Sequence, residues 1–156
     1  MSAVDREIYR VGDVVPHQGA MCLLDEILDW DDDSIVVRLK VPDSGIFVDG
    51  GGVPGWVGIE YMAQAVAAWA GCVARHDGRL PKIGFLLGSR RYNCSRSIFP
   101  CGSELTIKAR CELVGENGLG VFSCIIETDG EELASANVSV FQPADPLTYL
   151  ENEKND

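Results

Sequence analysis

Hydrophobic and polar residues alternate along two neighbouring segments near the start of the chain, as in β-strands that bury one face. In residues 34–41 every second position is a large aliphatic residue. Residues 21–30 precede this segment across the acidic sequence Asp31-Asp32-Asp33, and aspartate favours turns. The two segments are therefore predicted to form a β-hairpin.

The pattern changes over residues 57–76, which are rich in alanine and contain no proline. They begin just after Pro54-Gly55 and end before Asp77-Gly78, which are helix start and stop signals. The spacing predicts a helix of about five turns. Apolar residues occupy nearly every side of it, so other elements are expected to enclose the helix.

Strand-like patterns return at residues 82–91, 104–114, 120–127 and 132–141. The turn sequences Glu116-Asn117-Gly118 and Asp129-Gly130 separate the last three, because Asn and Gly accept the positive φ of tight hairpins. Two strands, one enclosed helix and four antiparallel strands predict an α+β hot-dog fold, in which a curved antiparallel sheet wraps one long helix. A generic α+β sandwich is the alternative. The half-open sheet leaves a strand edge uncovered, so a dimer is expected.

A chain of 156 residues, 46% of them hydrophobic, is long enough for one domain with a sizeable core. We expect a hot-dog domain over residues 16–142, an N-terminal extension over residues 1–15 and a flexible acidic tail over residues 143–156. No apolar run reaches the roughly 18 residues that span a membrane, and the N-terminus is too acidic for a signal peptide. A cytoplasmic protein without membrane insertion is expected.

The formal net charge of −11 argues against nucleic acid or an anionic membrane as the main partner, since both attract basic surfaces. Six of the 13 basic residues nevertheless fall between residues 75 and 96, where the only acid is Asp77. This cluster is either a solvated sheet edge or a landing patch for an anionic partner. Arg90, Arg91 and Arg96 are the candidates for docking.

Six cysteines are scattered through the chain without a CxxC pair, and only two histidines accompany them. This spacing offers no zinc-like ligand grouping. Scattered cysteines in a cytosolic chain are most often small buried hydrophobic residues. No metal site is expected.

The most informative feature is a carboxylate, Glu60, one turn inside the otherwise apolar helix. Burying an ionised carboxylate is costly, so Glu60 is expected to be paired, protonated or at a cleft; an exposed helix position is the alternative. Gln64 lies four residues on, within hydrogen-bonding reach on the same helix face. Free N–H groups near Gly55 and Trp56, with the helix dipole, are suited to polarise a substrate carbonyl. Gly55, Trp56 and Gln64 are therefore predicted to bind substrate.

The sequence PGWVGIEYMAQA at residues 54–65 resembles the helix motif of the bacterial 3-hydroxyacyl-[acyl-carrier-protein] dehydratases, and PHQGAMCLLD at residues 16–25 is similar to their opening motif. Within that family, PGW and the LLGSR segment are most similar to the divergent dehydratase-like proteins of aryl-polyene biosynthesis. The similarity runs from Pro16 to Phe141. It implies a hot-dog fold, a catalytic Glu60, no cofactor and substrates held as thioesters on an acyl carrier protein.

One departure from the family pattern affects the chemistry. The loop that carries the family's catalytic histidine reads GIFVDGGG at residues 45–52, with Ile46 at the histidine position. Isoleucine cannot transfer a proton, and loss of a general acid or base costs roughly 10² to 10⁴ in rate. One candidate replacement is His17, which would take the α-proton while Glu60 protonates the leaving hydroxyl. The other is Asp49 in the glycine-rich loop, which is also predicted to bind substrate. A structural histidine and a turn residue are the alternatives without catalytic roles.

Three functions fit these residues. The first is a dehydratase of fatty-acid or polyene-type biosynthesis, which converts a 3-hydroxyacyl thioester to the trans-2-enoyl thioester and depends on Glu60. The second is a catalytically weakened hot-dog subunit that supports an active paralogue in a heterodimer, as Ile46 indicates. The third is an acyl thioesterase, which needs an acidic helix residue and a water but no histidine. The sequence leaves open whether the dimer is a homodimer or a heterodimer.

Overall fold

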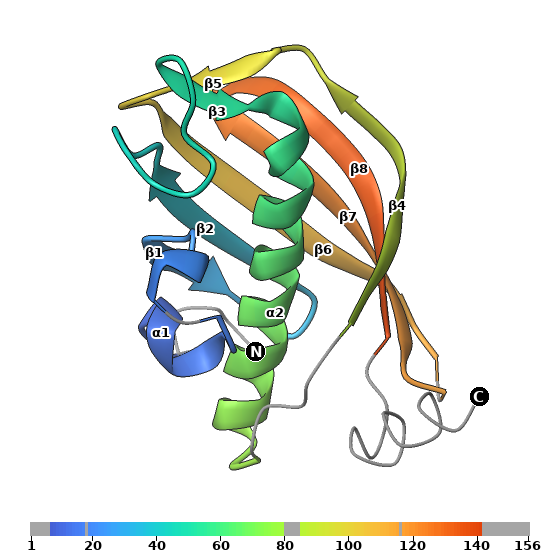
Figure 1. Ribbon diagram of the computed structural model, residues 1–156. Coiled ribbons are helices and arrows are strands. Elements are labelled where there is room, and N and C mark those ends of the chain that lie inside the picture. Colours follow the sequence, from blue (N-terminus) through green and yellow to red (C-terminus); the bar gives the residue numbers. More distant parts are fainter. Residues whose placement is uncertain (1–6, 18, 80–84, 116, 142–156) are drawn as a thin grey trace, which may run out of the picture.

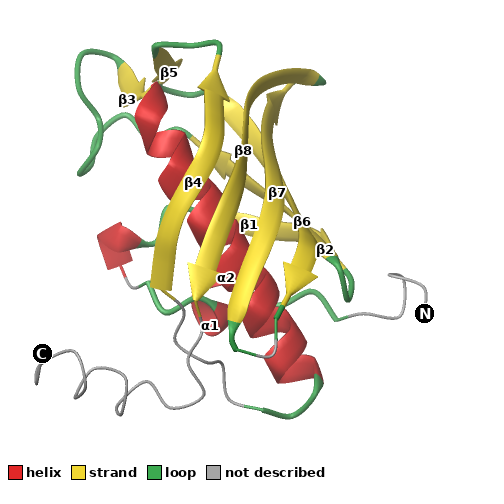
Figure 2. Ribbon diagram, turned by 90° about the vertical axis from the view of Figure 1, so that its right-hand side faces the viewer, coloured by secondary structure: helices red, strands yellow, loops and turns green. Residues whose placement is uncertain are grey.

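One long helix, α2 (Gly58–His76), forms the centre of the computed structural model and lies along the concave side of a curved antiparallel sheet (Figure 1). The structure describes residues 7–17, 19–79, 85–115 and 117–141, with only the backbone at residues 85–87. Seen from the side, the strands cross over the helix (Figure 2). This is the hot-dog arrangement that the residue pattern predicts.

The large sheet has six strands in the order β1-β2-β6-β7-β8-β4, each antiparallel to its neighbour. A second sheet pairs two short strands, β3 and β5, near the start of α2. The strand bounds are β1 (Glu26–Trp30), β2 (Ser34–Lys40), β3 (Gly52–Pro54), β4 (Phe85–Cys94), β5 (Ile98–Pro100), β6 (Glu104–Val114), β7 (Leu119–Thr128) and β8 (Glu131–Phe141).

The predicted segments agree with β2, β6, β7 and β8 to within one residue at each end. Strand β1 begins later than predicted, at Glu26, because a 3₁₀ turn (η2, Gly19–Met21) comes first. Strand β4 continues to Cys94, while residues 82–84 of its predicted start lie outside the described residues. The hairpin between β7 and β8 turns at Asp129 and Gly130, which have the positive φ values (49° and 79°) that the turn signal requires.

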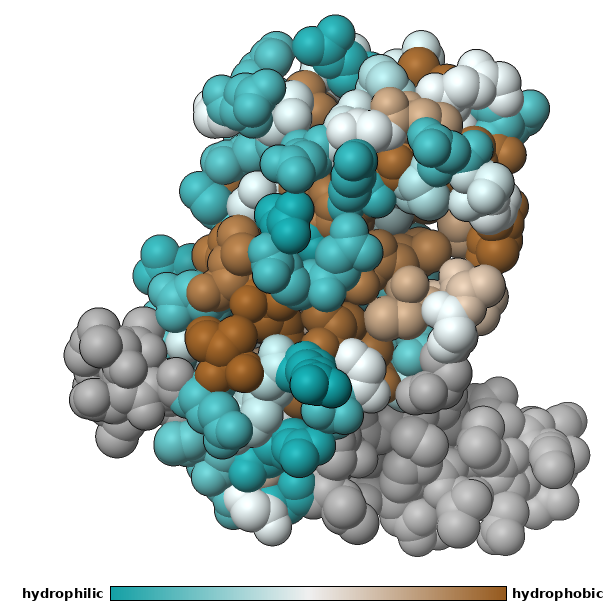
Figure 3. Space-filling model, turned by 90° about the vertical axis from the view of Figure 1, so that its left-hand side faces the viewer, coloured by the Kyte–Doolittle hydropathy of each residue, from teal (hydrophilic) through white to brown (hydrophobic). Residues whose placement is uncertain are grey.

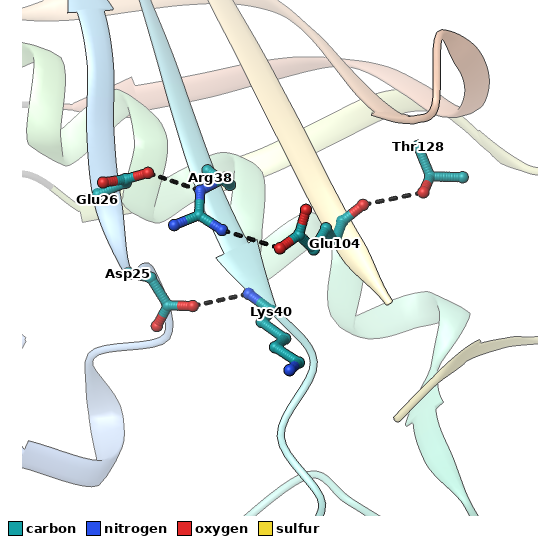
Figure 4. A network of polar contacts seen from close by, with 6 residues as sticks. All are labelled: Asp25, Glu26, Arg38, Lys40, Glu104 and Thr128. Carbon is teal, nitrogen blue, oxygen red and sulfur yellow. Dashed lines mark hydrogen bonds and ion pairs between the residues drawn. The ribbon is translucent and has the colours of Figure 1, made fainter. Parts of the chain in front are cut away.

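The two faces of the first strands differ in character. Ile35, Val37 and Leu39 of β2 are fully buried and face α2, opposite apolar residues of β6. The other face is polar: Arg38 lies between Glu26 of β1 (2.6 Å) and Glu104 of β6 (3.2 Å) (Figure 4). These contacts are exposed to solvent, so they contribute to register more than to stability.

Residues 11–15, which lie within the extension expected over residues 1–15, pack against the core of the domain. Helix α1 (Val11–Val14) packs against α2, and Val11, Val14 and Val15 are buried in the core. The two helices meet at Gly71, where a Cβ atom would lie only 2.1 Å from the Val14 carbonyl oxygen. Four helical residues are too few to show a hydrophobic period, so this packing escaped prediction. Residues 143–156 of the expected tail lie outside the described residues.

The apolar surface of the central helix is used inside the domain. Length and composition alone would allow Gly55–His76 to cross a membrane, but most of this helix is buried in the structure. Met62, Ala65 and Cys72 of this helix are fully buried in the hydrophobic core. The helix that the sequence predicts to be enclosed is therefore the core of the domain.

Candidate active site

His17 and Glu60 lie together at the N-terminal end of α2. Glu60 is in the first turn of the helix, which follows a 3₁₀ turn (η3, Gly55–Val57). His17 comes from the opening loop, just after α1. Its Nε2 atom is 3.6 Å from Glu60 Oε1, and the two side chains are 27% and 34% exposed, respectively. The fold brings together the two residues predicted to be catalytic and leaves both accessible to a substrate.

Gln64 connects the segments that carry this pair. Its side-chain oxygen accepts the Leu23 N–H at 2.9 Å, and its amide nitrogen donates to the Met21 carbonyl at 2.8 Å. The same nitrogen donates to Glu60 Oε1 at 3.1 Å. These bonds fix which way the amide points, since only the nitrogen end can donate. One side chain thereby holds the opening loop against the helix and orients the Glu60 carboxylate.

The predicted substrate contact of Gln64 stays a prediction, and its side chain is fully buried. The bond to Glu60 follows from the four-residue spacing and was predicted. The partners Leu23 and Met21 lie 41 and 43 residues away in sequence, so no local pattern indicates them. The geometry gives Gln64 a positioning role beneath the site.

The start of α2 offers fewer free donors than the sequence predicts. The Gly55 N–H donates to the Ser97 carbonyl at 2.9 Å, so it is not available to a substrate. Among the described residues, none accepts the Trp56 N–H, and the Trp56 side chain is 64% exposed. Glycine at position 55 serves packing, because a Cβ atom there would lie 2.3 Å from the Arg96 carbonyl oxygen. Trp56 is the accessible member of the predicted pair.

The loop before the helix contributes apolar side chains near Trp56. Ile46, which the sequence resemblance places at the histidine position, is 50% exposed. Phe47 meets Trp56 edge to face, with 6.0 Å between ring centroids. Asp49 is exposed, and its N–H donates to the Gly52 carbonyl at 2.8 Å, as in a turn. Within the described part of the chain, Asp49 has no hydrogen bond to the His17–Glu60 pair, so its catalytic and substrate-binding roles remain predictions without support from the fold.

Arg90, Arg91 and Arg96 are exposed on strand β4 and the turn that follows it. Arg96 is already engaged, because it lies 3.5 Å from the exposed carboxylate of Glu131. Strand β4 forms one edge of the large sheet, so both the landing patch and the solvated edge fit this position. Carrier docking stays a prediction.

Two hollows on the surface lie away from the catalytic candidates. One lies over β2, β6 and β7 near Lys108 and Arg110, and the other is lined by residues 95–100 with parts of β6 and β8. Neither contains His17 or Glu60. These hollows therefore do not supply a chamber for an acyl chain at the candidate site.

Comparison with known proteins adds to this geometry. Residues 9–151 match the family described as ApeP-like, ApeP dehydratase. Among solved structures, the chain is similar to the dehydratase heterocomplex ApeI:P from Xenorhabdus doucetiae, with 30% identity and a TM-score of 0.85 over 94% of this chain and 99% of that chain. No match is found among curated proteins.

More distant structures share the fold alone. A hypothetical thioesterase protein with coenzyme A from Streptococcus pneumoniae TIGR4 is 22% identical, with a TM-score of 0.59 over 76% of this chain and 88% of that chain. The protein smu.793 from Streptococcus mutans UA159, bound to acetyl-CoA, is 18% identical, with a TM-score of 0.58 over 74% of this chain and 86% of that chain.

The family match covers both the helix that carries Glu60 and the loop that carries His17. It confirms the dehydratase resemblance predicted from the motifs at residues 16–25 and 54–65, including the relation to aryl-polyene biosynthesis, and it favours the first of the three predicted functions over the thioesterase. The chain belongs to the ApeP-like dehydratase family.

Proposed function

We propose that the protein dehydrates 3-hydroxyacyl thioesters on an acyl carrier protein, with His17 and Glu60 as the acid–base pair. The observation that carries this proposal is the distance of 3.6 Å between His17 Nε2 and Glu60 Oε1. A dehydratase must take a proton from the carbon beside the thioester carbonyl and give one to the hydroxyl on the next carbon. Two neighbouring, partly exposed proton-transfer groups match that requirement.

In the proposed cycle, His17 acts as the base and Glu60 as the acid. His17 Nε2 takes the α-proton, since the Nδ1 atom is buried. The electron pair of the broken C–H bond forms the carbon–carbon double bond, and the hydroxyl leaves as water with the proton of Glu60. The imidazolium then returns a proton to the adjacent carboxylate, which restores the starting state.

Removal of the α-proton places negative charge on the thioester oxygen, so a donor aimed at this oxygen lowers the barrier. The Trp56 N–H is the proposed donor, because it lies at the positive end of the α2 dipole and is not used by the described residues. Losing one such donor costs about 10² to 10³ in rate in other enzymes.

We further propose that a second hot-dog chain completes the enzyme. The similar solved structure is a heterocomplex. Strand β4 is an edge strand whose outer side has no neighbour among the described strands, and a partner strand can extend the sheet there. The face shown in Figure 3 carries uncovered apolar surface between polar residues. A second chain would shield the acyl chain from water.

The second candidate is a supporting subunit that helps an active paralogue. It is favoured by Ile46, which the sequence resemblance places at the histidine position and which is half exposed. In that case a histidine of the paralogue supplies the chemistry, and the His17–Glu60 contact is structural.

The two candidates differ in an assay on a 3-hydroxyacyl carrier protein, read by the mass loss of one water. The protein is tested alone and with a hot-dog protein encoded beside it. Glu60→Gln and His17→Asn in this chain should each lower the rate at least about 100-fold, while Glu112→Gln, at an exposed carboxylate on β6, should not change it. Wild-type rates for both site variants in the assembled pair would establish the supporting role. If Glu60→Gln loses activity while His17→Asn keeps the wild-type rate, His17 is not part of the mechanism.

The docking proposal is tested separately by charge reversal. Arg90→Glu with Arg91→Glu should raise the KM for the carrier-bound substrate and leave kcat unchanged, because carrier proteins are acidic. Arg110→Glu, at an exposed position on β6, is the matched control. An unchanged KM in the double variant would show that the carrier binds elsewhere.

A further inference from the structure

Strand β4 departs from regular geometry near the start of helix α2. Its pairing with β8 is interrupted between Arg90 and Asn93, and Arg91 has a φ of 57° in the left-handed region. Arg90 and Arg91 are consequently both exposed, although successive strand residues normally face opposite sides, while Tyr92 is half-buried. The bulge turns Tyr92 toward the start of α2.

The hydroxyl of Tyr92 donates to the Gly55 carbonyl at 2.5 Å. The chain leaves room for this hydroxyl at Gly58, where a Cβ atom would lie 2.2 Å from it. Gly58 is therefore a glycine because Tyr92 occupies the space of a side chain. The bulge, the tyrosine and the two glycines form one arrangement around the first turn of the helix.

The accepting carbonyl of Gly55 belongs to the same peptide group as the Trp56 N–H. A hydrogen bond to the oxygen of a peptide group draws electrons toward that oxygen and makes the N–H of the group a stronger donor. It also fixes the plane of the peptide, and thus the direction in which the N–H points. We propose that Tyr92 is a positioning residue that strengthens and aims the Trp56 N–H at the thioester oxygen. This inference rests on the proposed function, in which that N–H stabilises the developing charge.

Tyr92 keeps its proton under the conditions of the reaction. Burial raises the pKa of its phenol well above the usual range, so the hydroxyl remains a donor at neutral and mildly alkaline pH. The Trp56 N–H is polarised equally across that range, and Tyr92 adds no pH dependence of its own.

The test compares Tyr92→Phe with Tyr61→Phe in the assembled enzyme. Tyr61 is a buried tyrosine that contacts Phe99 by its ring and does not donate to Gly55, so its replacement removes the same atom from the same region. Tyr92→Phe should lower kcat about tenfold, less than the loss of a direct donor, with KM changed less than twofold. Tyr61→Phe should retain the kcat of the wild type.

A second readout follows the carbonyl itself. The stretching frequency of an isotope-labelled enoyl thioester, bound to each variant, reports how strongly its oxygen is polarised. The frequency should be higher in Tyr92→Phe than in the wild type, and unchanged in Tyr61→Phe. If Tyr92→Phe fails to fold, a ring-fluorinated tyrosine at position 92, which is a stronger donor, should shift the frequency the opposite way.

The outcomes separate this inference from the function beneath it. An unchanged kcat and frequency in Tyr92→Phe, while Glu60→Gln is inactive, overturns the role of Tyr92 alone. Full activity of Glu60→Gln and His17→Asn overturns the proposed function, whatever Tyr92 does. Equal losses in Tyr92→Phe and Tyr61→Phe would show a general packing effect and also refute the inference.

Discussion

Replacement of Gln64 by leucine tests whether one buried amide organises the active site. Leucine has a similar size but no polar atoms, so the Leu23 N–H and the Met21 carbonyl lose their partner, and Glu60 loses the donor that orients it. The change leaves the helix and its apolar contacts intact. It therefore isolates the three hydrogen bonds.

The expected magnitude follows from the groups left without partners. An unsatisfied buried group costs about 1 to 3 kcal/mol, and the two loop groups are only partly buried, so the lower end applies to each. The sum is about 2 to 3 kcal/mol, which lowers Tm by roughly 5 to 10 °C in a domain of this size. The loop carrying His17 is released as well, and a misplacement of about 1 Å can lower the rate 100-fold.

The measurements are thermal unfolding and the dehydration assay, with Met62→Leu as control. Met62 is fully buried on the same helix, and an exchange of Met for Leu conserves volume. Gln64→Glu provides a second test. It replaces the amide nitrogen by a carboxylate oxygen, which faces both the Met21 carbonyl and the Glu60 carboxylate. One carboxyl of the pair must then hold a proton, so this variant should gain stability relative to wild type as the pH falls. A Tm and rate for Gln64→Leu equal to those of Met62→Leu would refute the reasoning.

Three further predictions concern other parts of the chain. Gly71→Ala should push α1 away from α2 through the clash with the Val14 carbonyl, which lies 2.1 Å from the added Cβ atom, and lower Tm by more than the few degrees that one exposed substitution changes; an unchanged or raised Tm would show that α1 adjusts freely. Burial raises the pKa of Cys72 and Cys124 to about 12, so both stay protonated at mildly alkaline pH, and mass spectrometry should find them alkylated only after unfolding. Rapid labelling of either thiol in the native protein would contradict its burial. Asp49→Asn should retain the wild-type rate, since the residue lies in an exposed turn; a loss of 100-fold or so would restore it as the second catalytic group.

The features that the sequence revealed are those encoded by neighbouring residues. Alanine-rich composition between two glycine-containing breaks placed α2, and the four-residue spacing predicted the bond between Glu60 and Gln64. The helix-start motif also led to Glu60 itself. Each of these signals depends on a helical period or a local break, which one chain displays without any knowledge of its fold.

The features that escaped prediction depend on contacts between distant segments. Tyr92 reaches Gly55 across 37 positions, and its inward direction depends on a bulge at Arg91 that no turn residue announces. Strands β3 and β5 have three residues each, too few for an alternating pattern. The hydrogen bonds that join Gln64 of α2 to the opening loop could not be predicted either. Only the folding of the sheet around the helix brings these groups together.

The glycines at the start of α2 have a consequence for how relatives of this protein are recognised. Gly55 and Gly58 are small because a carbonyl oxygen and a phenol occupy the adjacent space, so packing alone is enough to retain the two glycines of the PGWxG sequence. A gene that has lost its catalytic groups would keep these glycines as long as its product folds. Surveys that use this motif to assign activity will therefore collect silent subunits along with enzymes. The residues at positions 17 and 60 have to be inspected before turnover is inferred.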